Sequence, residues 1–475
     1  MRCLYVSAAQ KSSGKTVISL GLCAALAKRG LSIQPFKKGP DYIDPMWLSA
    51  AAGRTCWNLD FHTQSHAAIM ATVTLQTVDA DVALIEGNKG LHDGVDLEGR
   101  DSSAALAKLV GAAVVLVIDA SGMTRGIAPL LRGYQVFDSQ VQPRGIILNK
   151  VSGCRHESKL RAAIEHYVGI PVLGAVHVSQ DMNITERHLG LMPSNEHSTA
   201  REVINRIRDI VEQQVNIEGV LAAATVRISQ SQRLSTPTRP FPVVSSPRVR
   251  IAIACDAAFG FYYPDDMAAL VSAGAEVVPF DTLRDSCFPS NVDGLFIGGG
   301  FPEMHMKALE ANTTLRFAIR QALEEGLPTY AECGGLMYLS RRITWQGYTC
   351  AMVGAIAADT VMHDRPHGRG YMHIVETAAM PWPGRQSLIV YPAHEFHYSR
   401  LENLEADVQF AYDVLRGEGI TGRHDGIVTR NTLATYAHRR SVGALPWGWR
   451  FVAFVKACRA SSRAQSPNRR HSPLN

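Results

Sequence analysis

The chain has 475 residues, which exceeds the roughly 250–300 residues at which a single hydrophobic core stops growing. Hydrophobic residues make up 46% of it and charged residues 19%, a balance that excludes a disordered or fibrous protein. The formal net charge is +5, and the stretch 459–475 carries four arginines and no acid. We therefore expect two domains and a disordered basic tail over 459–475. No aromatic residue interleaves these arginines, so nucleic-acid binding is not expected.

The nine cysteines form no CxxC pair and show no disulfide framework, which indicates a reducing compartment. No secretory signal pattern precedes the first motif, and no apolar run reaches the ~18 residues of a membrane span. We expect a cytoplasmic protein that does not bind membranes.

Residues 1–225 alternate short apolar runs with segments of helical periodicity such as Val17–Lys28 and Arg155–Tyr167. This alternation predicts a parallel sheet that is buried on both faces. The predicted strands, in chain order, are Cys3–Ser7, Ser32–Phe36, Val82–Glu86, Ala113–Asp119, Gly145–Asn149 and Val172–Val176.

The first predicted strand leads through the sequence AQKSSGKT into a helix. This is nearly a P-loop, with Ala9 where the first glycine is expected. Backbone N–H groups of such a loop bind phosphate oxygens. Lys15 would supply positive charge to the terminal phosphates, and Thr16 would supply a hydroxyl to Mg²⁺. Lys11 is a candidate for a second phosphate contact, and a solvated loop lysine is the alternative.

Acidic residues follow later strands of the same predicted sheet. Asp41 and Asp44 lie in GPDYIDP, Glu86 ends the third predicted strand, and Asp93 follows in EGNKGLHDG. Ligands of parallel sheets gather at the carboxyl ends of the strands, so we expect these carboxylates near the phosphate loop. There they could hold Mg²⁺ together with phosphates and waters. Turn capping beside the prolines is the alternative for Asp41 and Asp44.

Further polar residues also stand at predicted strand ends. Lys37 and Lys38 follow the second strand and are candidates to meet phosphate or a substrate carboxylate. Asn149 ends the fifth strand and resembles an asparagine that contacts adenine. All three would lie at the same edge of the sheet as the loop.

Residues 226–248 are rich in Ser, Thr and Pro and have no periodic apolar face, so they read as a linker. The strand and helix pattern resumes at Val249–Cys255 and continues through Gly294–Ile297 and Thr329–Glu332. We predict a second α/β domain over 249–458. The fold class is therefore α/β with two domains.

Cys333 stands between an apolar strand and a helical pattern, with small residues at 331, 334 and 335. Such a turn exposes a nucleophile at a helix N-terminus, where the dipole favours a thiolate. A buried structural thiol is the alternative. Upstream, the glycines Gly298–Gly300 follow a strand and would let backbone N–H groups form an oxyanion hole.

A catalytic thiol needs a base, and three histidines are candidates: His394, His397 and His438. Catalytic triads assemble from distant segments, so spacing along the chain does not choose among the three. At this point the base is left open.

Six segments that run in one order over almost the whole chain are similar to the cobyrinate a,c-diamide synthase family. The family implies an N-terminal ATP-binding domain like dethiobiotin synthetase and a C-terminal class I glutamine amidotransferase domain. The segments are Gly39–Pro45, Glu86–Gly94, Gly298–Glu303, Ala331–Gly335, Ala393–Ser399 and Asp425–His438.

The resemblance implies roles for individual residues. It implies that Gly14, Lys15 and Thr16 bind ATP and Mg²⁺, with Thr16, Asp41 and Glu86 as metal ligands. Lys11 and Asn149 remain nucleotide-binding candidates from their positions alone. Metal binding, phosphoryl transfer and substrate positioning would involve Asp41, Tyr42, Asp44, Glu86 and Asp93. Lys38, Gly299 and Gly300 remain substrate-binding candidates from their positions alone. Cys333 would be the glutaminase nucleophile and His438 its base, and the acid that completes most class I triads is not evident.

The implied activity is amidation of the a and c carboxylates of a tetrapyrrole such as cobyrinate, through an acyl phosphate and ammonia from glutamine. Asn88, Lys89 and His92 depart from the family pattern, which keeps sirohaem or sirohydrochlorin open as the substrate. Arg439 and Arg440 after His438 are also unusual. A partitioning-type regulatory ATPase and a non-catalytic tetrapyrrole carrier are alternatives of other classes. A homodimer is left open.

Overall fold

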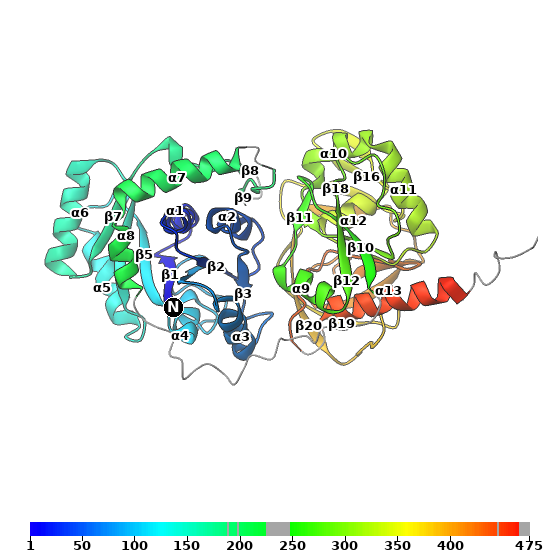
Figure 1. The fold of residues 1–475 in the computed structure, drawn as a ribbon, viewed down its shortest axis with the longest axis horizontal. Coiled ribbons are helices and arrows are strands. Elements are labelled where there is room, and N and C mark those ends of the chain that lie inside the picture. The colour runs from blue at the N-terminus through cyan, green and yellow to red at the C-terminus, as the bar shows by residue number, and fades with distance from the viewer. Residues whose placement is uncertain (188–189, 197–198, 225–247, 444–445, 465–475) are drawn as a thin grey trace, which may run out of the picture. The chain divides into compact units, whose positions relative to one another are not determined.

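The computed structural model describes residues 1–475 except 188–189, 197–198, 225–247, 444–445 and 465–475 (Figure 1). The chain divides into two compact units between Thr238 and Arg239, within the expected linker 226–248. Apart from Arg248, that linker lies outside the described residues. Within the described residues no helix combines the length and the apolar character of a membrane span. All nine cysteines are described, and all are free thiols.

The first unit is built on a seven-stranded sheet in the order β3-β2-β4-β1-β5-β6-β7. Every pairing in it is parallel. The six predicted strands are present, and a short edge strand, β3, was not predicted. The strands are β1 (Arg2–Ala8), β2 (Ile33–Lys38), β3 (Trp57–Leu59), β4 (Val82–Glu86), β5 (Ala113–Asp119), β6 (Pro143–Val151) and β7 (Val172–His177).

Helices cover both faces of this sheet, as a parallel sheet requires. One face packs against α1 (Lys15–Lys28), α2 (Ile43–Ala52), α7 (Ala200–Gln214) and α8 (Ile217–Ala223). The other packs against α3 (His66–Gln76), α4 (Ser103–Val110), α5 (Ile127–Phe137) and α6 (Cys154–Tyr167). A short turn η1 (Gln180–Met182) and a hairpin of β8 (Glu186–Arg187) and β9 (Gly190–Leu191) precede α7.

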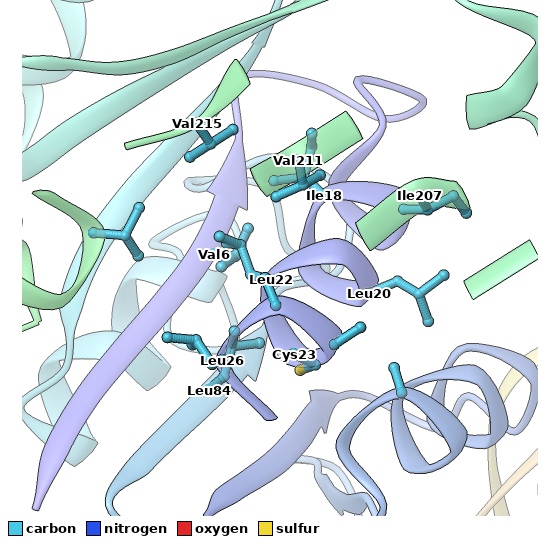
Figure 2. Packing of buried hydrophobic residues seen from close by; sticks show 14 of the residues in the cluster. Val6, Ile18, Leu20, Leu22, Cys23, Leu26, Leu84, Ile207, Val211 and Val215 are labelled. Carbon is cyan, nitrogen blue, oxygen red and sulfur yellow. The ribbon is translucent and has the colours of Figure 1, made fainter. Parts of the chain in front are cut away.

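The core on the α1 face brings strand and helix side chains together (Figure 2). Val6 of β1, Leu22 of α1 and Val211 of α7 all belong to this cluster, and all three are fully buried. Helices α1 and α7 approach so closely that a Cβ added at Gly21 would lie 2.4 Å from Val211 Cγ2. The glycine is therefore required by space.

We expect Gly21→Ala to lower the free energy of unfolding by about 1–3 kcal/mol, because the added methyl overpacks this contact. Urea denaturation measures the change. The double variant Gly21→Ala/Val211→Ala should be more stable than the sum of the single changes predicts, since truncated Val211 leaves room. Gly133→Ala, at an exposed position of helix α5, is the control, because its added Cβ meets nothing within 4 Å. Equal stability of Gly21→Ala and the parent chain would contradict the analysis.

The second unit is built on a nine-stranded mixed sheet in the order β12-β10-β13-β15-β24-β23-β22-β19-β20. Its first five strands are parallel: β12 (Ala275–Phe280), β10 (Val249–Ala254), β13 (Gly294–Ile297), β15 (Thr329–Glu332) and β24 (Thr432–Thr435). The rest pair antiparallel: β23 (His424–Thr429), β22 (Gln409–Arg416), β19 (Gly368–Glu376) and β20 (Val390–His397).

Helices cover both faces of this sheet as well. One face packs against α10 (Pro302–Ala311), α11 (Thr313–Glu324) and α12 (Gly334–Leu339). The other packs against α9 (Pro264–Ser272) and α13 (Trp447–Ala464). The smaller sheets pair β11 (Phe259–Phe261) with β14 (Gly299–Gly300), and β16 (Arg342–Trp345) with β17 (Tyr348–Ala351), β18 (Asp359–Met362) and β21 (Ser399–Glu402) in the order β17-β16-β18-β21.

Helix α13 corrects the predicted tail. It continues to Ala464, so residues 459–464 are helical and not a disordered tail. Two interactions explain this: Trp447 and Phe451 are buried in the core, and Arg459 forms an ion pair with Asp293 at 3.0 Å. Residues 465–475, the rest of the expected tail, lie outside the described residues.

Candidate active sites

The phosphate-loop candidate lies between β1 and α1, as predicted. Gly14 caps the helix with φ 87°, a conformation that favours glycine. Asn149 donates from Nδ2 to the carbonyl of Ser13 at 2.9 Å, and a Cβ on Gly14 would lie 2.1 Å from the same Nδ2. Asn149 therefore holds the loop backbone, and Gly14 is needed for both its dihedral angle and its size.

Other side chains support the same loop. The Tyr134 hydroxyl donates to the carbonyl of Ala9 at 2.8 Å, and Lys150 donates to the carbonyl of Ser12 at 3.1 Å. These contacts fix the loop although Ala9 replaces a glycine. Lys15 is buried at the start of α1, whereas Lys11 is exposed.

A buried charged cluster stands beside the loop. Thr16 donates from Oγ1 to Glu86 Oε1 at 2.7 Å and to Asp44 Oδ2 at 3.2 Å. Lys37 Nζ lies 2.9 Å from Glu86 Oε1 and 2.5 Å from Asp44 Oδ2. Lys37 is 3% exposed and Glu86 is fully buried, so each charge depends on the others for compensation. The structure thus brings together the predicted Thr16, Asp44 and Glu86.

The role of Lys37 in this cluster was missed. Sequence reasoning placed it at a strand end but did not pair it with an acid. The parallel register of β2 and β4 sets Lys37 opposite Glu86, and this pairing decides the contact. Lys38 points to the other face of β2, as strand alternation requires, and does not join the cluster. Burial lowers the pKa of Lys38, with Asp60 and Asp101 acting in the opposite direction.

Asp41, Tyr42 and Asp93 flank the cluster. Asp41 accepts from the backbone N–H of Asp44 at 3.0 Å, which is the turn-capping contact given as the alternative. Burial, and then the charge of Asp44, raise the pKa of Asp41 to about 7. Asp93 accepts from the N–H of Gly90 at 2.9 Å in an exposed loop, and Tyr42 occupies the N-cap position of α2. Asp93 therefore stabilises a turn beside the cluster and is not one of the paired carboxylates.

The cluster offers few ligands for a metal. Among the described residues, no group of three or more His, Cys, Asp or Glu could hold a metal ion by itself. Glu86 Oε2 is nevertheless buried with no hydrogen-bond partner among the described residues. One or two carboxylates and the Thr16 hydroxyl suit a hard cation that completes its coordination with phosphate and water oxygens.

Cys333 occupies the predicted strand-to-helix turn between β15 and α12. Its φ of 47° and ψ of −100° are unusual for a residue with a side chain, as at a nucleophile elbow. Its N–H donates to the carbonyl of Thr435 at 2.7 Å. A Cβ at Gly335 would lie 2.2 Å from the carbonyl oxygen of Ile297, so only glycine fits there. Helix α12 has six residues, so its dipole contributes less than predicted.

The Cys333 Sγ donates to the carbonyl oxygen of Phe396 at 3.9 Å, and the same thiol raises the pKa of the ring of His438. The Nδ1 of His438 lies 3.3 Å from Oε2 of Glu332, the residue before the cysteine. Both side chains are buried. Burial alone would lower the pKa of His438, but its hydrogen bonds to Cys333 and Glu332 outweigh burial and raise the pKa to about 10. The surroundings of the His438 ring thus favour its protonated form.

The other two candidate histidines, His394 and His397, pack against the segment that carries His438. The His394 ring stacks on that of His438 at 4.8 Å, and the two backbones exchange hydrogen bonds of 2.8 and 3.1 Å. His397 stacks on Tyr436 at 3.8 Å, and its Nδ1 lies 2.8 Å from the carbonyl of Ser399. These positions favour His438 as the partner of the thiol.

The loop Gly298–Gly300 approaches both members of the pair. A Cβ at Gly299 would lie 3.0 Å from His438 Cε1, and one at Gly334 would lie 3.0 Å from the backbone nitrogen of Gly300. Backbone therefore comes as close to the elbow as an oxyanion hole needs.

The two arginines after His438 are buried and paired. Arg440 forms an ion pair with Asp265, and Arg439 lies 3.3 Å from Glu376 and above the Tyr391 ring. They anchor the segment that carries the histidine.

Comparisons with known proteins agree with the two units. The family model described as CobQ/CobB/MinD/ParA nucleotide binding domain matches residues 5–191, and that described as CobB/CobQ-like glutamine amidotransferase domain matches residues 250–441. Among solved structures, PurLQS from Thermotoga maritima aligns with 44% of this chain and 98% of its own, with 15% identity and a TM-score of 0.35. A likeness this weak carries no argument.

Curated relatives match over nearly the full length. The cobyrinate a,c-diamide synthase of Magnetococcus marinus is 47% identical over 450 residues, which cover 94% of this chain and 95% of the relative. That of Methanosarcina acetivorans is 39% identical and covers 92% of each chain. The chain therefore belongs to the cobyrinate a,c-diamide synthase family.

Proposed function

We propose that this protein is an ATP- and glutamine-dependent ligase that converts the a and c carboxylates of cobyrinate to amides. The observation that carries the proposal is the presence of two built sites on one chain. One is the phosphate loop with Thr16, Lys37 and Glu86, and the other is the Cys333 elbow with His438. The free state of all nine cysteines supports a cytoplasmic location.

The first site activates the acid. A carboxylate does not react with ammonia, because its oxygen is a poor leaving group. Attack of the carboxylate oxygen on the γ-phosphate of ATP breaks the bond to the β-phosphate, giving an acyl phosphate and ADP. Lys15 stabilises the charge of the transferring phosphoryl group. Thr16 and Glu86 would hold Mg²⁺, which neutralises phosphate charge when bound.

The second site releases ammonia. The Cys333 thiolate attacks the side-chain amide carbon of glutamine, and His438 gives its proton to the leaving nitrogen. Water then hydrolyses the glutamyl thioester to glutamate and regenerates the thiol. Backbone N–H groups near Gly299 and Gly300 would stabilise the tetrahedral oxyanion, which the close approach of this loop to His438 supports.

Ammonia completes the reaction at the acyl phosphate, where it forms the amide and displaces phosphate. Ammonia that escapes into water would be protonated and lost to the reaction, so its transfer must exclude solvent. Two rounds give the a,c-diamide and consume two ATP and two glutamine molecules.

Mass spectrometry of the products tests the substrate. With ATP, Mg²⁺ and glutamine, we expect cobyrinate to gain two amides, with hydrogenobyrinate and sirohaem tested side by side. Asn88 and Lys89 follow Glu86 of the buried cluster by two and three residues. They are therefore the residues that we expect to determine a different choice of substrate. Amidation of sirohaem with no turnover of cobyrinate would contradict the proposed substrate while keeping the chemistry.

Two substitutions separate the sites. Cys333→Ala should abolish glutamine-driven amidation and keep amidation with added ammonium, because only the thiol step is lost. Lys15→Ala should abolish both, because no acyl phosphate forms. Cys287→Ala removes an exposed thiol of the same unit and should keep both activities. Glutamine-dependent turnover by Cys333→Ala would show that the thiol site is misassigned.

Nucleotide binding should depend on pH. Burial, together with nearby Lys37, lowers the pKa of Lys15 to about 8. The phosphates of ATP favour the ammonium form, so binding raises this pKa and takes up a proton above pH 8. Affinity should fall as pH rises through 8, by up to about tenfold per pH unit.

Calorimetry in buffers of different ionisation enthalpy measures this proton uptake directly. The variant Lys11→Ala, which changes the exposed lysine of the same loop, should keep the uptake. Affinity that stays constant from pH 7 to pH 9 would contradict the assignment to Lys15.

A further inference from the structure

The carboxylate of Glu332 lies where the third member of a catalytic triad would act. Its Oε2 is 3.3 Å from His438 Nδ1, and its Oε1 accepts from the Tyr330 hydroxyl at 2.6 Å. Both oxygens are therefore engaged, and the side chain is 2% exposed. Since Nδ1 faces Glu332, Nε2 is the ring nitrogen left to exchange a proton with Cys333.

We propose that Glu332 is the positioning residue of the glutaminase site: it fixes the His438 ring with Nε2 toward Cys333 and stabilises the imidazolium. The proposal rests on the proposed function of the thiol site. It places the orienting acid directly before the nucleophile in the chain, a position that sequence reasoning passed over.

The fold explains how adjacent residues serve one ring. Residues i and i+2 of a strand share a face, so Tyr330 of β15 lies beneath Glu332 and can donate to it. The unusual dihedral angles of Cys333 then turn the chain sharply after Glu332. The side chains of Glu332 and Cys333 therefore both act on His438, which lies in the segment after β24.

The charges around Glu332 favour His438 as its cationic partner. Burial, followed by the charge of Glu332, raises the pKa of Asp266 and of Tyr330 well above the usual values. Burial also raises the pKa of Tyr262, with Glu332 a minor contributor. These three groups are thus held toward their neutral forms. From β20, His394 stacks on the far face of the ring and contacts the Tyr263 hydroxyl at 3.4 Å.

The test compares Glu332→Gln and Glu332→Asp in the full chain with the parent. Glu332→Gln keeps the size of the side chain but not its charge. We expect its glutaminase kcat to fall by about 10²–10⁴-fold, as when a triad carboxylate is neutralised. Amidation with added ammonium should be unchanged, which shows that the chain is folded and that the ligase site works.

The pH profile distinguishes positioning from a merely structural role. Without the carboxylate the imidazolium loses its proton more easily, so the alkaline limb of kcat/KM for glutamine should move to lower pH. Glu332→Asp should recover part of the rate and of the profile. Glu395→Gln removes another buried carboxylate of the same unit, one that accepts from the N–H groups of Glu418 and Gly419, and should leave the alkaline limb in place.

Glutaminase activity of Glu332→Gln within threefold of the parent would overturn the proposal. So would a loss of activity with an unmoved alkaline limb and no recovery in Glu332→Asp. Failure of the proposed function looks different, because Cys333→Ala would then keep glutamine-dependent turnover.

Discussion

Both candidate sites depend on parallel strand pairing, which ends several strands at a common edge of a sheet. In the first unit, pairing of β2 with β4 sets Lys37 opposite Glu86, and β1 leads into the phosphate loop at the same edge. In the second unit, pairing of β15 with β24 brings Glu332 beside Thr435, three residues before His438. A slip of one residue in either register would turn these side chains to the other face.

Buried charge is the second constraint, because an unpaired ion inside a protein is strongly unfavourable. Lys37 is compensated by Asp44 and Glu86, and Arg450 is compensated by both oxygens of Glu376. Each network joins segments far apart in the sequence, so it fixes their relative positions within its unit. In the first unit, buried Lys37 requires its carboxylate partners, and this requirement keeps Asp44 and Glu86 beside the phosphate loop.

The strands of the first sheet other than β3, the phosphate loop after β1 and the Cys333 turn after β15 could all be predicted from the sequence. Runs such as that of β5, which is apolar up to its last residue, Asp119, could be predicted as strands. Strand β3 has three residues, too few for a periodic signal, and the antiparallel strand β22 carries mixed burial on both faces. The contacts of Lys37 and Glu332 depend on register and turn geometry, which spacing along the chain does not encode. The sequence shows that Glu332 precedes Cys333, but it does not show that the Glu332 side chain contacts His438.

The adjacency of Glu332 and Cys333 makes the elbow itself the determinant of the thiol site. Backbone strain of this kind costs about 1–3 kcal/mol and persists only when neighbouring contacts impose it. Here the N–H of Cys333 donates to Thr435, and its carbonyl accepts from Met337 at 3.0 Å. One peptide unit thus positions the nucleophile and the carboxylate together. Any change that relaxes the turn would move both away from the imidazole, so strain and chemistry are linked at a single residue.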